Sequence, residues 1–220
     1  MRPRFLCLLL LSWVGLFSWA PGAGLARVKD DPRSTFPGRR VGGGTRGECT
    51  SRQIVHLVPE SSVYAPGESR LLAVLTGASP QPRPLQLSFQ PRQAGATAPA
   101  PAEQRLLPAD PDAALLLVRS TAVVLPTVWE SSFVCGTSAH SQPHTADPLG
   151  LAVGIAPPAE SLLLPPRDST AADLAWQAKL KQLQSRCGGT VGVQELASIF
   201  GLAELHDGWP AQLPVRCPAS

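Results

Sequence analysis

The stretch Leu85-Gln-Leu-Ser-Phe89 decides the fold class, because its apolar and polar residues alternate strictly. Successive side chains of a β-strand point to opposite faces, so the three apolar side chains would share one buried face. Further short apolar runs occupy residues 54–58, 70–75, 114–118 and 122–125, and Trp129, Ser131, Phe133 and Cys135 alternate along a last strand. Several short strands separated by turn signals predict a β-sandwich.

A turn signal separates the first two of these runs. In Tyr64-Ala-Pro-Gly-Glu68, Pro66 fixes φ and Gly67 permits a positive φ. The turn resembles those that precede a strand in macroglobulin-type and other immunoglobulin-like extracellular sandwiches. Phe133-Val-Cys135 likewise resembles the Tyr-x-Cys of an immunoglobulin strand. These matches cover about eight residues, and no tryptophan lies midway between the cysteines as in an immunoglobulin domain, so we assign no family.

The N-terminal residues predict export from the cell. Arg2 and Arg4 precede an apolar run at residues 5–17, and small residues follow at 20–24, which is typical of a secretory signal peptide. A membrane-spanning helix needs about 20 apolar residues, more than this run contains. We expect cleavage after Gly22 or Gly24, and no later run is long enough to span a membrane. The sequence therefore predicts a secreted chain without a membrane span.

The charge balance gives no indication of a polyanionic partner. The chain has 19 basic and 16 acidic residues, and removal of Arg2 and Arg4 with the signal leaves 17 and 16, a net charge of +1. No run of lysine and arginine exceeds two residues. We therefore expect no binding to nucleic acid.

The cysteines predict two disulfide bonds. Cys7 leaves with the signal, and Cys49, Cys135, Cys187 and Cys217 remain. An even number of cysteines in an exported chain favours disulfides, and three pairings are possible. We favour Cys49–Cys135 and Cys187–Cys217, because each pair falls inside one apparent structural region.

The C-terminal part has a helical pattern. Thr170 and Asp173 have the spacing of a capping box, and Trp176, Leu180 and Leu183 recur at helical spacing. A glycine pair at 188–189 ends this helix, and a second amphipathic stretch follows at 193–205. Two helices joined by a glycine turn predict an αα-hairpin.

The predicted fold class is α+β and mainly β: an immunoglobulin-like, sandwich-type region with long proline-rich loops, followed by a small C-terminal α-helical hairpin. The expected organisation is a signal peptide (1–22), a disordered N-terminal arm (23–48), a β-sandwich-like domain (49–155), a proline-rich linker (156–169) and the helical hairpin (170–220). Residues 91–112 hold many prolines and are too long for an ordinary hairpin loop. This stretch indicates either a disordered excursion or a wrong strand assignment.

No motif for catalysis or cofactor binding occurs. The chain lacks Gly-x-Ser-x-Gly, His-Glu-x-x-His, a phosphate-binding glycine loop and a dinucleotide fingerprint. His140, His144 and Asp147 have a spacing that could reach one zinc ion, but Pro143 and Pro148 interrupt the segment. We interpret it as a solvated loop and expect no enzyme activity, no cofactor and no metal.

One short segment suggests proteolytic processing. Gly38-Arg39-Arg40 is the arrangement used in peptide precursors, in which a protease cuts after the basic pair and the glycine becomes a C-terminal amide. A basic patch in a flexible arm is the alternative, and we favour it because pairs of basic residues are common in exposed segments of exported chains.

Three hypotheses of function follow. The first is a secreted, non-enzymatic protein that binds an extracellular protein partner through a disulfide-stabilised β domain. The second is a secreted precursor cut at Arg39-Arg40, which would release a short peptide or a trimmed chain. The third is a shortened isoform of a receptor ectodomain.

Overall fold

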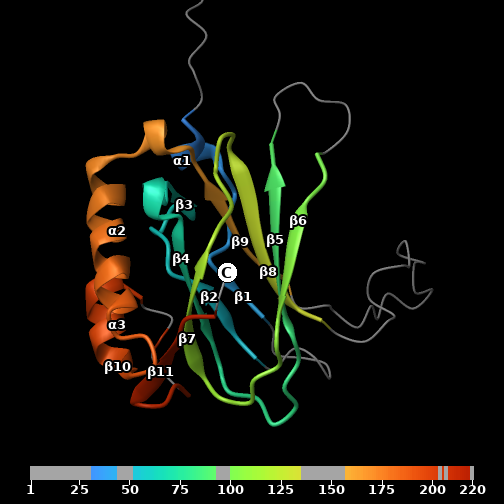
Figure 1. Cartoon of the computed structure of the whole chain (residues 1–220), viewed down its shortest axis with the longest axis vertical. Helices are drawn as coiled ribbons and strands as arrows, with labels where there is room; N and C mark the ends of the chain where they lie inside the picture. Colours follow the sequence, from blue (N-terminus) through green and yellow to red (C-terminus); the bar gives the residue numbers. More distant parts are fainter. Residues whose placement is uncertain are drawn as a thin grey trace, which may run out of the picture. The chain divides into compact units, whose positions relative to one another are not determined.

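Two β-sheets face each other in the computed structural model of the chain (Figure 1). The structure describes residues 31–43, 52–92, 100–134, 157–202, 205 and 208–218. In this part of the chain the strands are β1 (Val41–Gly42), β2 (Ile54–His56), β3 (Val63–Tyr64), β4 (Leu71–Thr76), β5 (Leu85–Pro91), β6 (Glu103–Leu107), β7 (Ala114–Arg119), β8 (Thr127–Phe133), β9 (Ala159–Leu163), β10 (Thr190–Gly192) and β11 (Gln212–Arg216). The helices are α1 (Pro32–Thr35), α2 (Ala171–Gln184) and α3 (Val193–Phe200), with short 3-10 turns η1 (Gly67–Ser69) and η2 (Pro166–Asp168).

The strands form one sheet of six and one of five. The six-stranded sheet has the order β1-β2-β4-β7-β11-β10, and the five-stranded sheet has the order β3-β9-β8-β5-β6. Most neighbours are antiparallel, but β11 runs parallel to β7 and β3 runs parallel to β9. The predicted mainly β, α+β class is confirmed.

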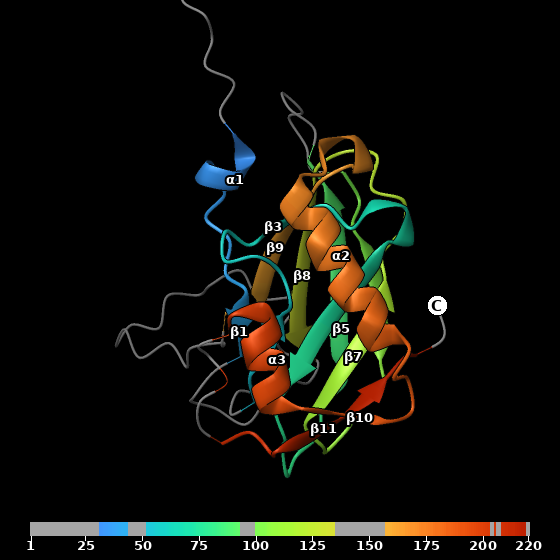
Figure 2. The same cartoon turned by 90° about the vertical axis from the view of Figure 1, so that its left-hand side faces the viewer.

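The strand predicted at residues 85–89 is confirmed, both in its position and in the side chains that it buries. Leu85, Leu87 and Phe89 of β5 are buried, whereas the residues between them are half-buried. By contrast, β4 is buried at all six positions. Helices α2 and α3 cover one face of the six-stranded sheet, and the five-stranded sheet covers the other (Figures 1 and 2). A strand covered on both faces loses the alternating pattern.

The predicted turn between the first two runs is also confirmed. Gly67 has a φ of 62° and begins η1, and Arg70 ends it in the left-handed region with a φ of 53°. A Cβ at position 67 would meet the side chain of Gln177 on α2. Glycine therefore allows both the turn and the close approach of the helix.

Helix α2 begins as the sequence predicts. The Thr170 hydroxyl accepts from the main-chain N–H of Asp173, and the Asp173 carboxylate accepts from the main-chain N–H of Thr170. Leu180 and Leu183 are buried, and the Trp176 indole N–H donates to the Leu57 carbonyl at 2.8 Å. The predicted face of α2 therefore packs on the sandwich.

The C-terminal region differs from a simple helical hairpin. Helix α3 ends at Phe200, and the next residue, Gly201, adopts a left-handed conformation with a φ of 61°, so the helix is shorter than the predicted 193–205. The two helices do contact each other, since the rings of Trp176 and Phe200 lie 5.0 Å apart. However, β10 lies between them in the chain and pairs with β11, which extends the six-stranded sheet.

Several segments expected to be irregular contain regular structure. The linker expected at 156–169 contains β9, which lies between β3 and β8. The proline-rich stretch 91–112 contains β6, an edge strand whose partner is β5. The arm expected to be disordered over 23–48 contains α1 and β1 within its described residues 31–43. Strand β6 and helix α1 have no buried residue, so they leave a weak periodic signal. Strand β9 lies inside its sheet and is buried at four of its five positions, so its pattern does not alternate.

One predicted strand is wrong. Residues 122–125 form no strand and lie in the connection between β7 and β8. Val123 is buried but Val124 is 70% exposed, and Pro126 follows directly before β8. Apolar composition alone therefore misled the assignment at this loop.

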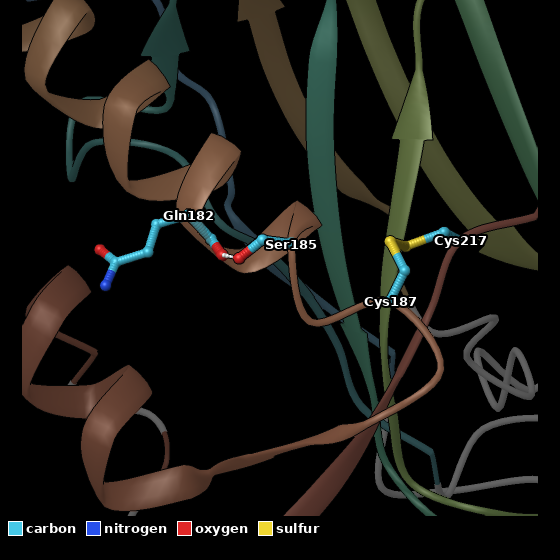
Figure 3. The surroundings of a disulfide bond; sticks show 4 residues. All are labelled: Gln182, Ser185, Cys187 and Cys217. Carbon is cyan, nitrogen blue, oxygen red and sulfur yellow. Dashed lines mark hydrogen bonds between the residues drawn. A yellow bond between two sulfur atoms is a disulfide. The ribbon is translucent and has the colours of Figure 1, made fainter.

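The C-terminal disulfide prediction is confirmed. Cys187 and Cys217 are bonded, with their Cα atoms 5.7 Å apart, and the bond joins the turn after α2 to the residue that follows β11 (Figure 3). Beside it, the Ser185 hydroxyl donates to the Gln182 carbonyl in the last turn of the helix. Cys49 and Cys135, the other predicted pair, lie outside the described residues.

Candidate functional site

A cavity of about 340 Å³ opens between the two sheets and is the strongest candidate for a site. Its apolar walls come from both sheets: Leu85, Leu107 and Phe133 from the five-stranded sheet and Leu116 from the six-stranded sheet. A smaller hollow of about 200 Å³ near Phe89 has no cationic residue in its lining. Binding pockets are mostly apolar with a few placed polar groups, and the larger cavity has this character.

Arg52 supplies the most deeply placed charge of this cavity. Only 4% of the residue is exposed, and its guanidinium carbon lies 5.0 Å from the centre of the Phe133 ring. Its Nε donates to the Gly77 carbonyl, and its Nη2 donates to the Asp112 carbonyl at 2.7 Å and to the Thr76 hydroxyl at 3.3 Å. Neutral main-chain and hydroxyl oxygens hold this cation, so its positive charge is oriented but not neutralised by direct pairing.

Charges of both signs lie around Arg52. Burial, and then repulsion from Arg216, lower the pKa of Arg52 to about 10, while Asp112 opposes the shift. Arg216 itself pairs with Asp110 and, at 3.2 Å, with Asp112. The two carboxylates thus lie with Arg216, and Arg52 has no carboxylate within ion-pair distance in the described chain.

Arg83 completes the set of cations. It lines the cavity, is half-buried and makes no hydrogen bond or ion pair with the residues that the structure describes. A guanidinium carries five N–H donors in a fork that matches a carboxylate. The cavity therefore combines apolar walls with one arginine whose donors have no partner in the described chain.

The disulfide supports one wall of the cavity. Arg216 is the last residue of β11, and Cys217 and Pro218 follow it in the lining. The pairing of Arg216 with Leu116 of β7 and the bond from Cys217 to Cys187 fix both sides of this segment. The bond thus holds in place the arginine that pairs with both carboxylates.

A second cluster contains residue types used in catalysis. His56 of β2 lies between Ser161 and Ser131, each 2.8 Å from a ring nitrogen, and its ring stacks on Trp129 with centroids 3.5 Å apart. His56, Ser131, Ser161 and Trp129 are all fully buried. Burial lowers the pKa of His56 well below its usual value. No surface reaches this cluster, so it joins the two sheets as a neutral hydrogen-bonded bridge.

The predicted processing residues Arg39 and Arg40 precede β1 in an extended segment between the two sheets. We call this segment, residues 39–42, the seam. The main-chain groups of Arg39 and Glu160 of β9 hydrogen-bond to each other at 2.9 and 2.6 Å, and His56 N–H donates to the Arg40 carbonyl at 2.7 Å. A Cβ at Gly42 would overlap the main-chain nitrogen of Ala159. At Gly38 a Cβ would overlap the ring of Phe36. The dibasic pair is therefore hydrogen-bonded to β2 on one side and to β9 on the other.

The remaining candidates from the sequence are the three possible zinc ligands and the membrane span. His140, His144 and Asp147 lie outside the described residues. In the described ranges, no three histidine, cysteine or acidic side chains are grouped so that they could hold a metal ion. No helix in these ranges is both long and apolar enough to cross a membrane.

The sequence analysis missed the cavity arginines. Arg52, Arg83 and Arg216 are far apart in the sequence and belong to no motif. The available signal is that each lies at or near the end of a strand, where side chains from different strands can meet. Only the sheet order shows that these ends are close.

Comparison with known proteins adds no relative. The chain matches no protein-family model, no curated protein and no solved structure. The interpretation of the site therefore depends on its own geometry.

Proposed function

We propose that the chain is a secreted, non-enzymatic protein that binds an extracellular protein partner through its β-sandwich. The cavity between the sheets carries this proposal, because apolar walls and correctly placed guanidinium groups are what a binding pocket needs. Arginine and aromatic side chains also dominate the energetics of protein interfaces. Arg52, Arg83 and Phe133 supply both types at one place.

The absence of an accessible catalytic arrangement in the described chain supports a binding role. A general base must come within hydrogen-bond reach of its substrate. His56 is fully buried and both of its ring nitrogens contact serine hydroxyls. The histidine therefore serves the packing of the two sheets in this proposal.

The disulfide supports the proposed export. Disulfides form and persist in oxidising compartments, and the Cys187–Cys217 bond fits a chain that passes through one. The predicted signal peptide at 1–22 supports the same route.

The seam weighs against the precursor hypothesis for the folded chain. Proteases commonly bind substrates as extended strands with free main-chain groups. The main-chain groups around Arg39 and Arg40 are already bonded to β9 and β2. Cleavage after Arg40 would require this seam to open first. In the third hypothesis, a shortened isoform of a receptor ectodomain, the sandwich would likewise bind a protein partner.

The test has two steps. First, the chain is expressed in mammalian cells and its intact mass is measured from the medium with and without reduction. We expect one species that starts near residue 23 and gains about four mass units as two disulfides open. A species that starts at Val41 would instead support the precursor.

Second, the secreted chain is screened for binding to a panel of displayed extracellular domains. We expect a partner whose binding is lost with Leu107→Glu, which places a charge in the apolar wall of the cavity. The matched control is Leu174→Glu, because Leu174 is 59% exposed on α2 and does not line the cavity. Equal loss with both variants, or no loss with either, would contradict binding at the cavity.

A further inference from the structure

We propose that the cavity binds the C-terminal residue of a partner polypeptide, with the carboxylate at the arginines and an apolar side chain against the walls. This inference rests on the proposed function and names the chemistry that the cavity selects. It depends on three features of the cavity: its net charge, its size and the state of its hydrogen-bond donors.

The net charge of the cavity fits a single negative charge. Arg52, Arg83 and Arg216 contribute three positive charges, and Asp110 and Asp112 contribute two negative charges at Arg216. The difference is one positive charge, which one carboxylate would neutralise. A phosphate dianion would leave an unbalanced negative charge in a mostly apolar site, which costs free energy.

The free donors point to where the carboxylate lies. Arg216 is occupied by two carboxylates, and Arg52 uses its Nε and Nη2 on carbonyl and hydroxyl oxygens. No hydrogen bond of the Arg52 Nη1 or of Arg83 is found among the described residues. These two guanidinium groups can therefore donate to a carboxylate, and charge-assisted bonds of this kind are among the strong ones.

The size of the cavity selects a small apolar group. The volume of about 340 Å³ lies at the lower end of the roughly 300–1,000 Å³ that ligand pockets have. It therefore suits a small group such as a terminal leucine or phenylalanine residue with its carboxylate. The Leu85, Leu107 and Leu116 side chains supply a wall that such a side chain would contact.

The combination distinguishes a C-terminal residue from an internal acidic one. An aspartate or glutamate side chain carries its carboxylate on one or two methylene groups and would leave the apolar walls uncovered. A C-terminal residue carries a carboxylate and an apolar side chain on the same Cα, and capture of a terminal carboxylate is a known recognition mode. A medium-chain fatty acid has the same chemistry, so the test includes it.

The test measures binding of short probes to the purified secreted chain by titration calorimetry. The probes are acetyl-Gly-Ser-Leu with a free carboxylate, the same peptide as its C-terminal amide, and octanoate. We expect the free acid to bind and the amide to bind at least about tenfold more weakly, because the amide loses the charge-assisted hydrogen bonds. Equal binding of acid and amide, or binding of neither, would overturn the proposal.

Matched arginine variants locate the carboxylate. Arg83→Gln should weaken binding of the free acid about tenfold or more and leave the weak binding of the amide unchanged. Because Arg83 has no partner in the described chain, this change should not disturb folding, which thermal unfolding checks. The control is Arg167→Gln, since the Arg167 side chain is 72% exposed and lies outside the cavity. Similar effects of both variants would overturn the assignment to the cavity.

The outcomes separate this inference from the proposed function. Binding of octanoate but not of the peptide would overturn the polypeptide source. A displayed partner whose binding is lost with Leu107→Glu but kept with Arg83→Gln would support the proposed function and overturn the recognition of a carboxylate. Loss with both variants, together with peptide binding, would support both.

Discussion

Asp173 should contribute more to stability than any other single charged side chain of the α2 region, and Asp173→Ala tests this. The side chain is fully buried at the start of α2. It accepts from Thr170 through N–H and hydroxyl at 2.7 Å each, from the Ala65 N–H at 3.1 Å and from Arg33 at 2.6 and 3.3 Å. It therefore joins the helix, the turn after β3 and the N-terminal segment.

The magnitude follows from these contacts. Loss of the cap costs about 1 kcal/mol. The Ala65 N–H is buried and would lose its partner, which costs about 1–3 kcal/mol. The Arg33 side chain is 21% exposed, so its ion pair adds at most about 1 kcal/mol. We expect a total of about 3 kcal/mol, or a fall in Tm of about 6–12 °C for a chain of this size.

Thermal and urea unfolding of the secreted chain measure this loss. The control is Asp168→Ala, because the Asp168 side chain is 46% exposed and its contact with Arg167 is 3.9 Å long. We expect the control to change stability by less than about 0.5 kcal/mol. A loss below about 1 kcal/mol for Asp173→Ala would refute the reasoning that these contacts cooperate.

The same carboxylate predicts a pH dependence. Burial alone would raise the pKa of Asp173, but the hydrogen bonds from Thr170, Ala65 and Arg33 outweigh it and hold the pKa below its usual value. A group whose pKa is lower in the folded state contributes stability that is complete above its unfolded pKa, near 4. The contribution is lost as the pH falls through the folded pKa. The stability difference between the wild type and Asp173→Ala should therefore shrink below about pH 4.

Three further changes test other parts of the fold. Gly42→Val should open the seam, because any Cβ there overlaps the main chain of β9. Limited trypsin digestion should then cut after Arg39 or Arg40 far faster than in the wild type, which has the same cleavage sites. Equal cleavage rates would contradict the bonding described for this segment. Replacing Cys187 and Cys217 by serine should cost about 3–4 kcal/mol in urea unfolding, since the bond closes a loop with a sequence separation of 30, and an unchanged midpoint would show that β10 and β11 need no bond. Because burial lowers the pKa of His56, the unfolded chain binds a proton below about pH 6.5 that the folded chain excludes. The free energy of unfolding should therefore fall by up to about 1.4 kcal/mol for each pH unit below that value. His56→Gln should remove this pH dependence, and an unaltered dependence would show that another group causes it.

The parts of the fold that the sequence predicts are those with a strong local pattern. Leu85, Leu87 and Phe89 alternate because only one face of β5 is covered, and Thr170 and Asp173 form their capping box within one turn. The disulfide between Cys187 and Cys217 follows from their position in one region. The strand and the capping box depend on residues that are close in sequence, and the disulfide on two cysteines within one C-terminal region.

The parts that the sequence does not predict depend on contacts between distant segments. The sequence predicts a proline-rich linker where β9 lies, yet in the structure β9 pairs with β8 on one side and with β3 on the other. Strand β11 contains Pro214, which favours an edge or a bulge, and still pairs with β10 and β7. Pairing partners, and with them the cavity, are decided by the whole sheet order and not by local preference.

The buried position of Arg52 bears on both the stability of the chain and its proposed function. A buried cation held only by neutral oxygens pays a desolvation cost that an apolar residue would avoid, and replacing buried charges by apolar residues is often neutral or stabilising. The carbonyls of Gly77 and Asp112 at the strand ends fix the guanidinium over Phe133 and leave its Nη1 without a hydrogen bond in the described chain. In the proposed binding role, a fixed cation beside an apolar cavity would pre-organise the recognition of an anion, because the ordering cost is met during folding and not on binding.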